Sequence, residues 1–434
     1  MLPLKLQKEI ELYYKKNFSA KKFLPGKTRI PHAGKVFDEK ELNALIEACL
    51  DGWWTEGRFA QEFEKKFAKY LDTKYVTLVN SGSSANLVAF MSLTSKVFKE
   101  RAIKPGDEVI TSATAFPTTV NPIIQAGCVP VFVDNDIETG NITAEQIKKA
   151  MSKKTKAIMV AHTLGNPIPL DEILKIVKKN KLWLIEDCCD ALGSTYDGKM
   201  LGTFGDVATF SFYPAHHITM GEGGAIVTKN PLIHRSIRQF RDWGRDCWCD
   251  TGKDNTCRKR FAWKMGLLPY GYDHKFIYSQ IGYNLKLTDM QPALGLAQLE
   301  KLDSFIKKRN ENFRRIFRHM KKYEKYFILP KWEKKASPSW FGFLLTIKDN
   351  APFKRLDIIN FLEKKNIATR TLFSGNLLRH PAYMNIKHRK VGSLKNSDKF
   401  TNDAFWIGVY PGIKDEMLKF ILKSFDDFFI DKII

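Results

Sequence analysis

The sequence predicts an α/β protein with a large, mainly parallel sheet and a smaller C-terminal α/β domain. Short β-rich segments alternate with helical patterns along the first half of the chain, the rhythm of parallel strands joined by crossover helices. The 434 residues suffice for two or three domains with a large buried core. A hydrophobic content of 44% and a charged content of 27% exclude wholesale disorder, collagen and coiled coil.

The first elements are predicted in chain order. Residues 1–35 suggest an N-terminal helix followed by a basic arm, and Gln61–Leu71 carries apolar residues at helical spacing. Residues 36–300 form the predicted large domain, with helices at Asn86–Lys99 and Ala144–Met151 between some of its strands. The β-rich segments are Tyr75–Val79, Glu108–Thr111, Val129–Val133, Ala157–Ala161, Leu182–Ile185, Val207–Phe212 and Ala225–Thr228.

Residues 242–284 interrupt this rhythm. The segment is rich in Gly, Cys, aromatic and charged residues, and we call it the excursion. Long segments without regular structure are usually functional or disordered. The small domain, residues 301–434, is predicted to begin with a basic helix at Asp303–Tyr326. A strand at Phe341–Ile347, a helix at Phe353–Lys365, a further strand and a final helix follow.

The chain has a formal net charge of +23, which indicates anionic partners such as phosphates, nucleic acid or an acidic protein. Residues 301–350 are especially basic. A solvated helix face is the favoured interpretation, docking of an acidic protein or nucleic acid being the alternatives. Because the sequence contains no recognised nucleic-acid module, we expect no nucleic-acid partner.

Neither export nor membrane insertion is expected. Charges in the first residues come too early for the apolar stretch of a signal peptide. The longest uncharged run, 109–133, contains Pro117, Pro122 and Pro130, which argues against a membrane helix. The cytoplasm is therefore the expected location, where the seven cysteines would be metal ligands or buried thiols rather than disulfides.

Three motifs carry chemistry. In Val79–Asn86 a strand gives way to a helix through a turn of small residues, which can bind an anion or simply cap the helix. Leu184–Ala191 delivers Asp187 to the C-terminal end of a buried strand, where it needs a cationic partner such as a pyridinium nitrogen, or is a structural carboxylate. Thr209–Gly224 places two histidines beside a Gly-rich turn, where they are suited to proton transfer or to a structural role.

In this order the motifs resemble the sugar aminotransferase family, vitamin B6 enzymes that act on nucleotide-linked keto sugars. The resemblance runs from about Gly34 to the C-terminus and includes Gly282–Asn284, Leu287–Gln291 and Ala293–Gly295. It implies the type I fold of aspartate aminotransferase and an obligate homodimer. It also implies cofactor contacts: Asp187 at the pyridine nitrogen, Ser83, Ser84 and Ser211 at the phosphate, Phe116 over the ring, and Asn284 reaching the phosphate in the neighbouring subunit.

One departure from the family changes the expected reaction. Its aminotransferases carry a Schiff-base lysine five residues after the serine that matches Ser211, and here that position is His216. An imidazole cannot form the covalent imine with pyridoxal phosphate, but it can move a proton beside non-covalent pyridoxamine phosphate. This matches the 3-dehydrases of 4-keto-6-deoxy sugars. His216 would be the general base, Tyr213 a weaker proton donor, and Asp190, where aminotransferases often have His or Gln, would tune His216 or restrain transamination.

Four cysteines form a further constellation. Cys189, Cys247, Cys249 and Cys257 are separated by 57, 1 and 7 residues. By chemistry alone, four thiolates serve structural zinc and iron–sulfur centres equally. The spacing resembles the [2Fe-2S] motif of the 3-dehydrases that act on CDP-linked 4-keto-6-deoxyglucose, which implies a flavin or iron–sulfur reductase as electron donor. The other three, Cys49, Cys128 and Cys188, are expected to be core thiols.

Three alternatives stay open. A pyridoxal-phosphate-dependent sugar aminotransferase conflicts with His216, and a glutamate-coupled 3-dehydrase without a cluster conflicts with the cysteine quartet. The third alternative, a nucleic-acid-binding protein with a structural zinc, is supported only by the net charge and the four cysteines. The sequence leaves the nucleotide open, CDP or dTDP, and it leaves open the final dideoxysugar and the sugar contacts. Candidates for these contacts are Thr369, Arg370, Arg379 and His380.

Overall fold

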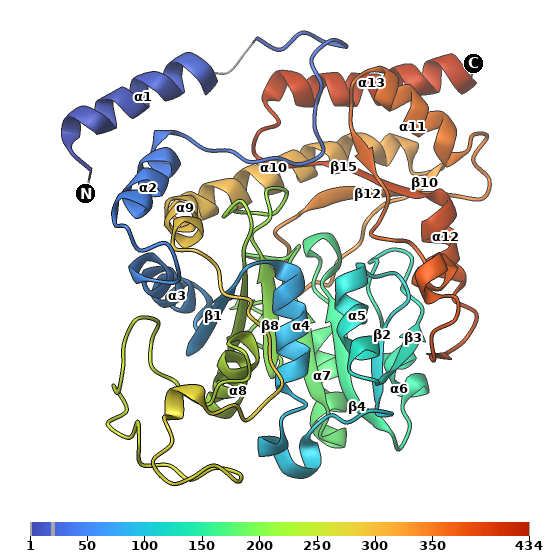
Figure 1. Ribbon diagram of the computed structural model, residues 1–434. Helices are drawn as coiled ribbons and strands as arrows, with labels where there is room; N and C mark the ends of the chain where they lie inside the picture. The colour runs from blue at the N-terminus through green and yellow to red at the C-terminus, as the bar shows by residue number, and fades with distance from the viewer. Residues whose placement is uncertain (1, 19–21, 434) are drawn as a thin grey trace.

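A computed structural model describes residues 2–18 and 22–433 and is built around one eight-stranded sheet (Figure 1). The strand order is β1-β9-β8-β5-β4-β2-β3-β14, and within it only β9 runs antiparallel to its neighbours. The strands are β1 (Tyr75–Val79), β2 (Glu108–Ser112), β3 (Val129–Val133), β4 (Thr155–Ala161), β5 (Trp183–Asp187), β8 (Val207–Ser211), β9 (Gly224–Thr228) and β14 (Arg389–Lys390). The predicted parallel sheet and the seven strand positions are confirmed.

Helices cover both faces of this sheet because its strands are apolar on both sides. Along β5, Leu184 faces a core formed with α3, α6, α7 and α9, whereas Trp183 and Ile185 face a core formed with α4, α5 and α8. These helices are α3 (Arg58–Leu71), α4 (Gly82–Ser92), α5 (Pro117–Gln125), α6 (Ala144–Ala150), α7 (Leu170–Asn180), α8 (Pro231–Arg241) and α9 (Met290–Leu299). The helix expected at Asn86–Lys99 is instead α4, followed by the 3₁₀ helix η1 (Lys96–Arg101).

The C-terminal residues build a second core on an antiparallel sheet of order β10-β12-β15-β13. Its strands are β10 (Phe327–Ile328), β12 (Gly342–Ile347), β13 (Thr369–Arg370) and β15 (Ala404–Gly408). Its helices are α10 (Leu302–Met320), α11 (Arg355–Lys364), α12 (Lys395–Asp403) and α13 (Asp415–Ile433). Phe23 and Ile30 of the N-terminal arm pack into this core. The domain boundaries given above stay a prediction.

The remaining elements are short or peripheral. They are the helices α1 (Leu4–Phe18) and α2 (Glu39–Leu50), the small sheet of β6 (Thr195–Tyr196), β7 (Lys199–Met200) and β11 (Ala336–Ser337), and the 3₁₀ helices η2 (Thr163–Gly165), η3 (His274–Phe276), η4 (Lys321–Tyr323), η5 (Leu377–Arg379) and η6 (Pro381–Tyr383). Within the described ranges, no helix is both long and apolar enough to cross a membrane.

The excursion is almost devoid of regular structure, as its composition predicts, and holds only η3. It leaves the body after α8, and its two ends meet through isolated bridges of Asp242 with Asn284 and of Arg245 with Tyr278. We call these paired ends the stem. Figure 1 shows the excursion, in yellow-green, at the lower left, far from the C-terminal helices at the top.

Candidate active site

The predicted site residues converge on one cavity of about 620 Å³. It lies where β1, β5 and β8 end and α4 begins, and residues of the C-terminal domain close it. Open α/β sheets bind ligands at this edge because the strands present loops and helix N-termini there. The predicted residues that line the cavity are Ser83, Phe116, Asp187, Cys189, Asp190, Ser211, Tyr213 and His216.

One end of the cavity is suited to an anion. The N-terminus of α4 opens there with its unpaired backbone N–H groups, and Ser83 and Ser211 border the same space. The two segments meet closely at Gly82, where an added Cβ would lie 2.4 Å from Cβ of Ser211. Ser84 lies behind this end, where its hydroxyl donates a hydrogen bond to the side-chain oxygen of Asn80 at 2.6 Å. Its backbone N–H donates to Ser81 Oγ at 3.1 Å, so Gly82 and Ser83, rather than Ser84, border the cavity at this end.

The buried Asp187 lies at the end of β5, away from the anion seat. Asn86 donates a hydrogen bond to its Oδ2 at 2.8 Å, and the Thr119 hydroxyl donates to the same oxygen at 2.7 Å. The backbone N–H of Cys189 donates to Oδ1 at 3.1 Å. No Lys or Arg of the described residues forms an ion pair with this carboxylate, so its charge is held in place by neutral donors. The predicted cationic partner would have to come from a ligand.

His216 and Asp190 form a close pair on the cavity wall, with His216 Nδ1 3.5 Å from Asp190 Oδ1. Burial lowers the pKa of His216 to about 4 and raises the pKa of Asp190 to about 8, the latter helped by the charge of Asp187. Both side chains are therefore neutral near pH 7, and the imidazole is free to accept a proton. Nδ1 of His216 is itself buried and has no hydrogen-bond partner among the described residues.

Arg309 of α10 was not predicted from the sequence. Its guanidinium is 1% exposed and donates hydrogen bonds to the carbonyls of His216, Trp340 and Phe341. Burial lowers the pKa of Arg309 to about 10, so it stays charged. The sequence did not indicate that Arg309 is buried, since nothing in the basic pattern of α10 distinguishes it from the exposed arginines of that helix. It fixes the backbone that carries His216.

Aromatic and basic side chains also line the wall. Phe116 and Tyr213 are both about half exposed and border the cavity. His32 of the N-terminal arm also lines it, and burial lowers the pKa of His32 to about 4. Of the C-terminal residues proposed as sugar contacts, Arg370 lines the cavity, whereas Arg379 pairs with Asp398 at a separate site.

Other predicted site residues lie elsewhere. Asn284 is at the base of the stem, and Cys247, Cys249 and Cys257 are on the excursion; none of these four lines the cavity that contains Cys189. Among the other cysteines, Cys128 and Cys188 are buried, as expected. Cys49 is exposed on α2, so its assignment as a core thiol was wrong. Its position just before the end of an amphipathic helix places it outside the packed face.

The fold and this cavity together define a vitamin B6-dependent enzyme of the aminotransferase fold. A family model described as the DegT/DnrJ/EryC1/StrS aminotransferase family matches residues 35–426. The chain therefore belongs to that family, whose members include sugar-modifying enzymes named as 3-dehydratases.

Similar proteins of known name agree with this assignment. The chain is 53% identical over 417 residues to a protein of Salmonella typhimurium named lipopolysaccharide biosynthesis protein RfbH, covering 96% of this chain and 95% of the relative. It is 51% identical over 406 residues to the dTDP-4-dehydro-2,6-dideoxy-D-glucose 3-dehydratase of Saccharopolyspora spinosa, covering 94% and 88%. A solved E. coli GDP-4-keto-6-deoxy-D-mannose-3-dehydratase with bound hydrated PLP superposes with a TM-score of 0.80 at 30% identity, covering 91% and 98%.

Proposed function

We propose that the protein removes the C3 hydroxyl of a nucleotide-linked 4-keto-6-deoxyhexose with pyridoxamine phosphate as cofactor. The observation that carries this proposal is His216, an imidazole on the cavity wall where the family's aminotransferases have a lysine. The cavity is also bordered by His32 and Arg370 but, within the described part of the chain, by no lysine. An amine for covalent capture of pyridoxal phosphate is thus replaced by a base that leaves the cofactor free.

The residues fit this cofactor. The N-terminus of α4, Ser83 and Ser211 would hold the phosphate, the ring of Phe116 would cover the pyridine, and Asp187, which lacks a cationic partner, would hold the proton on the ring nitrogen. When bound, pyridoxamine phosphate supplies an amine that condenses with the C4 ketone and a ring that accepts an electron pair.

His216 would then act as the general base. Because its imidazole is neutral near pH 7 and lines the cavity, it can remove a proton from the carbon that bears the cofactor's amine. The same imidazole can return the proton to the C3 oxygen as that group leaves as water, with Tyr213 as a second donor. Asp190, kept protonated by burial, holds its place beside His216 without adding a negative charge.

Replacement of the C3 hydroxyl by hydrogen consumes two electrons and two protons and releases water. A flavin or iron–sulfur reductase would supply the electrons. The spacing of Cys189, Cys247, Cys249 and Cys257 supports a [2Fe-2S] cluster, yet the four thiols do not come together within one chain. We therefore derive no step through such a cluster.

CDP-4-keto-6-deoxyglucose is the proposed substrate, on the strength of the cysteine motif, and a homodimer is the proposed assembly. The similarity to a dTDP-sugar dehydratase makes the nucleotide the first variable to test. The product would be a 4-keto-3,6-dideoxy sugar nucleotide of the kind used in surface polysaccharide, in keeping with the name of the Salmonella relative.

The test incubates anaerobically purified protein with pyridoxamine phosphate, a reductase with NADH, and either the CDP- or the dTDP-linked 4-keto-6-deoxyglucose. We expect a product that lacks one oxygen, detected by mass spectrometry, with the CDP sugar turned over faster. An amino sugar formed with pyridoxal phosphate and glutamate would instead identify an aminotransferase. Deoxygenation driven by glutamate without a reductase would identify the glutamate-coupled enzyme. Faster turnover of the dTDP sugar would refute the proposed nucleotide alone.

A further inference from the structure

The four cysteines of the motif lie in two separate places. The thiols of Cys247 and Cys249 contact each other and lie within electrostatic range of Cys257. The electrostatic neighbours of the Cys189 thiol are instead Asp187, Asp190 and Cys188. Across the described residues, the one trio of side chains close enough to share a metal ion comprises His162, Glu186 and Cys188. That trio contains none of the four motif cysteines.

The excursion thiols are anchored on both sides. Asp246, directly before Cys247, is 3% exposed and accepts a hydrogen bond from Arg235 of α8 at 3.0 Å. Thr251, two residues after Cys249, donates to Glu56 Oε2 at 3.0 Å.

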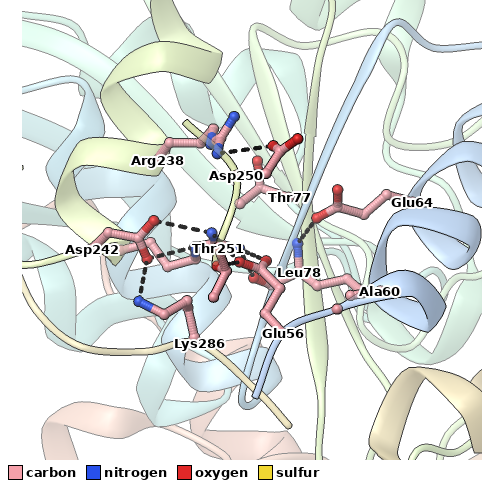
Figure 2. Close-up of polar contacts among 12 residues, drawn as sticks. Glu56, Ala60, Glu64, Thr77, Leu78, Arg238, Asp242, Asp250, Thr251 and Lys286 are labelled. Atoms are coloured by element: carbon pink, nitrogen blue, oxygen red, sulfur yellow. Dashed lines mark hydrogen bonds and ion pairs between the residues drawn. The ribbon is translucent and has the colours of Figure 1, made fainter. Parts of the chain in front are cut away.

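The carboxylate that Thr251 contacts is itself part of a buried network (Figure 2). Glu56 pairs with Arg241, which is 2% exposed and also binds Asp242 at 3.0 Å. On the carboxylate side of Asp242, Lys286 completes the network at 3.2 Å. Removing one member of such a buried pair leaves an uncompensated charge and is strongly destabilising. The anchors therefore fix where the Cys247–Cys249 segment lies relative to the sheet.

The Cys247–Cys249 segment lies beside a different strand of the sheet from Cys189. Asp250 and Thr251 share a cavity with Tyr75 and Thr77 at the start of β1, whereas Cys189 follows the end of β5. Strands β9 and β8 lie between β1 and β5, so three strand spacings, about 14 Å, separate them across the sheet before the offset along the strands is added. The ligands of one [2Fe-2S] cluster surround two adjacent iron atoms and cannot span such a gap.

We infer that the cluster forms between two copies of the chain, with Cys247, Cys249 and Cys257 from one and Cys189 from the other, two clusters per dimer. This inference rests on the proposed iron–sulfur function. Cys189 is part exposed and borders the active-site cavity, so ligands from a second copy can approach it through that opening. No segment has to leave its anchors.

The surface of the excursion supports a second copy as its partner. Ile281 and Leu267 are 93% and 106% exposed, and single chains seldom leave so many large apolar groups in water on one segment. Other exposed aromatic side chains on it are Trp243, Phe261, Tyr270, Phe276 and Tyr278. Asn284, which is predicted to reach the cofactor site of the neighbouring subunit, lies in the stem of the excursion that carries the three cysteines. One surface would thus deliver both the amide and the thiols to the neighbouring subunit.

A mixed dimer distinguishes the two topologies. Cys189→Ser and Cys249→Ser chains with different affinity tags are co-expressed, and the heterodimer is purified anaerobically through both tags, its composition being checked by native mass spectrometry after the assay. A cluster shared between chains leaves one site intact and the other doubly substituted. We expect half the iron and sulfide of wild type, with an unchanged electron paramagnetic resonance signal after reduction.

A cluster built within one chain would be broken in both subunits, and absence of iron from the heterodimer would overturn the inference. The matched control pairs Cys49→Ser, at the exposed cysteine of α2, with Cys249→Ser, which retains one intact site in either topology and so must give half occupancy. Wild-type protein that binds zinc instead of iron and sulfide would overturn the iron–sulfur function itself, and the inference with it. A clustered wild type with an empty heterodimer would overturn the shared topology alone.

Discussion

Asp187→Asn tests the assignment of this carboxylate to the ring nitrogen of the cofactor. The substitution keeps the shape of the side chain but removes its charge. It also sets an amide N–H against the donors that now surround the carboxylate, which are Asn86, Thr119 and the backbone N–H of Cys189. Asparagine can accept with only one of its two terminal atoms, so at least one of these donors loses its partner.

The expected magnitude follows from these contacts. A hydrogen bond to a charged group contributes about 1.5–3 kcal/mol, so loss of the pyridinium partner weakens binding of pyridoxamine phosphate roughly 10- to 100-fold. The unpaired donor lowers the stability of the apoprotein by about 1–3 kcal/mol. Calorimetric titration measures the first effect and thermal unfolding of the apoprotein measures the second.

Asp206→Asn is the matched control. Asp206 accepts a hydrogen bond from the backbone N–H of Leu184, at the opposite end of the strand that carries Asp187. This variant should lose stability without losing cofactor affinity. If Asp187→Asn bound pyridoxamine phosphate as tightly as wild type, Asp187 would be a structural carboxylate and the assignment of the cavity to this cofactor would fail.

Three further predictions concern residues around the site. His216→Asn removes the base, so we expect dehydration to slow by about 10²- to 10⁴-fold, with cofactor affinity changed less than threefold. A rate near wild type would exclude His216 as the base. Arg309→Met leaves the carbonyls that this buried cation binds without a donor and should lower the free energy of unfolding in denaturant by about 2 kcal/mol. Arg314→Met, on the exposed face of α10, should change it very little, and equal effects of the two substitutions would contradict the positioning role of Arg309. Burial raises the pKa of Glu64 to about 7, so between pH 4.5 and 7 the folded state holds a proton that the unfolded state has released. The free energy of unfolding should therefore fall by up to about 2 kcal/mol over this range, allowing for solvent screening. Glu64→Gln should lack this fall, and a variant with the same pH profile as wild type would disprove the role of Glu64.

The sequence was sufficient for the sheet and for the residues at its C-terminal edge. Strands such as β5 are apolar on both faces, and the motifs that end them must face the same cavity because parallel strands share one carboxyl edge. It was insufficient for contacts made between distant segments. His32 and Phe341 reach the cavity from the N-terminal arm and the second sheet, and Arg309 reaches the backbone of His216 from α10. No local pattern marks a side chain whose role depends on tertiary packing. The cysteine spacing likewise did not indicate that Cys189 borders the cavity while Cys247 and Cys249 lie together on the excursion.

The charges in the cavity explain why the histidine and its acidic neighbour belong together. His216 and Asp190 are both neutral near pH 7, so the pair adds no charge to the cavity wall. A lysine at position 216 would lie beside Asp190 and draw its proton, since an ion pair is favoured over two neutral groups when cation and carboxylate are close. The amine would then be held as an ammonium ion and would be a poor nucleophile toward an aldehyde. Asp190 is therefore compatible with a histidine that stays neutral and unfavourable for a lysine that must form an imine. The choice between loss of water and amino-group exchange thus depends on residues 190 and 216 together rather than on His216 alone.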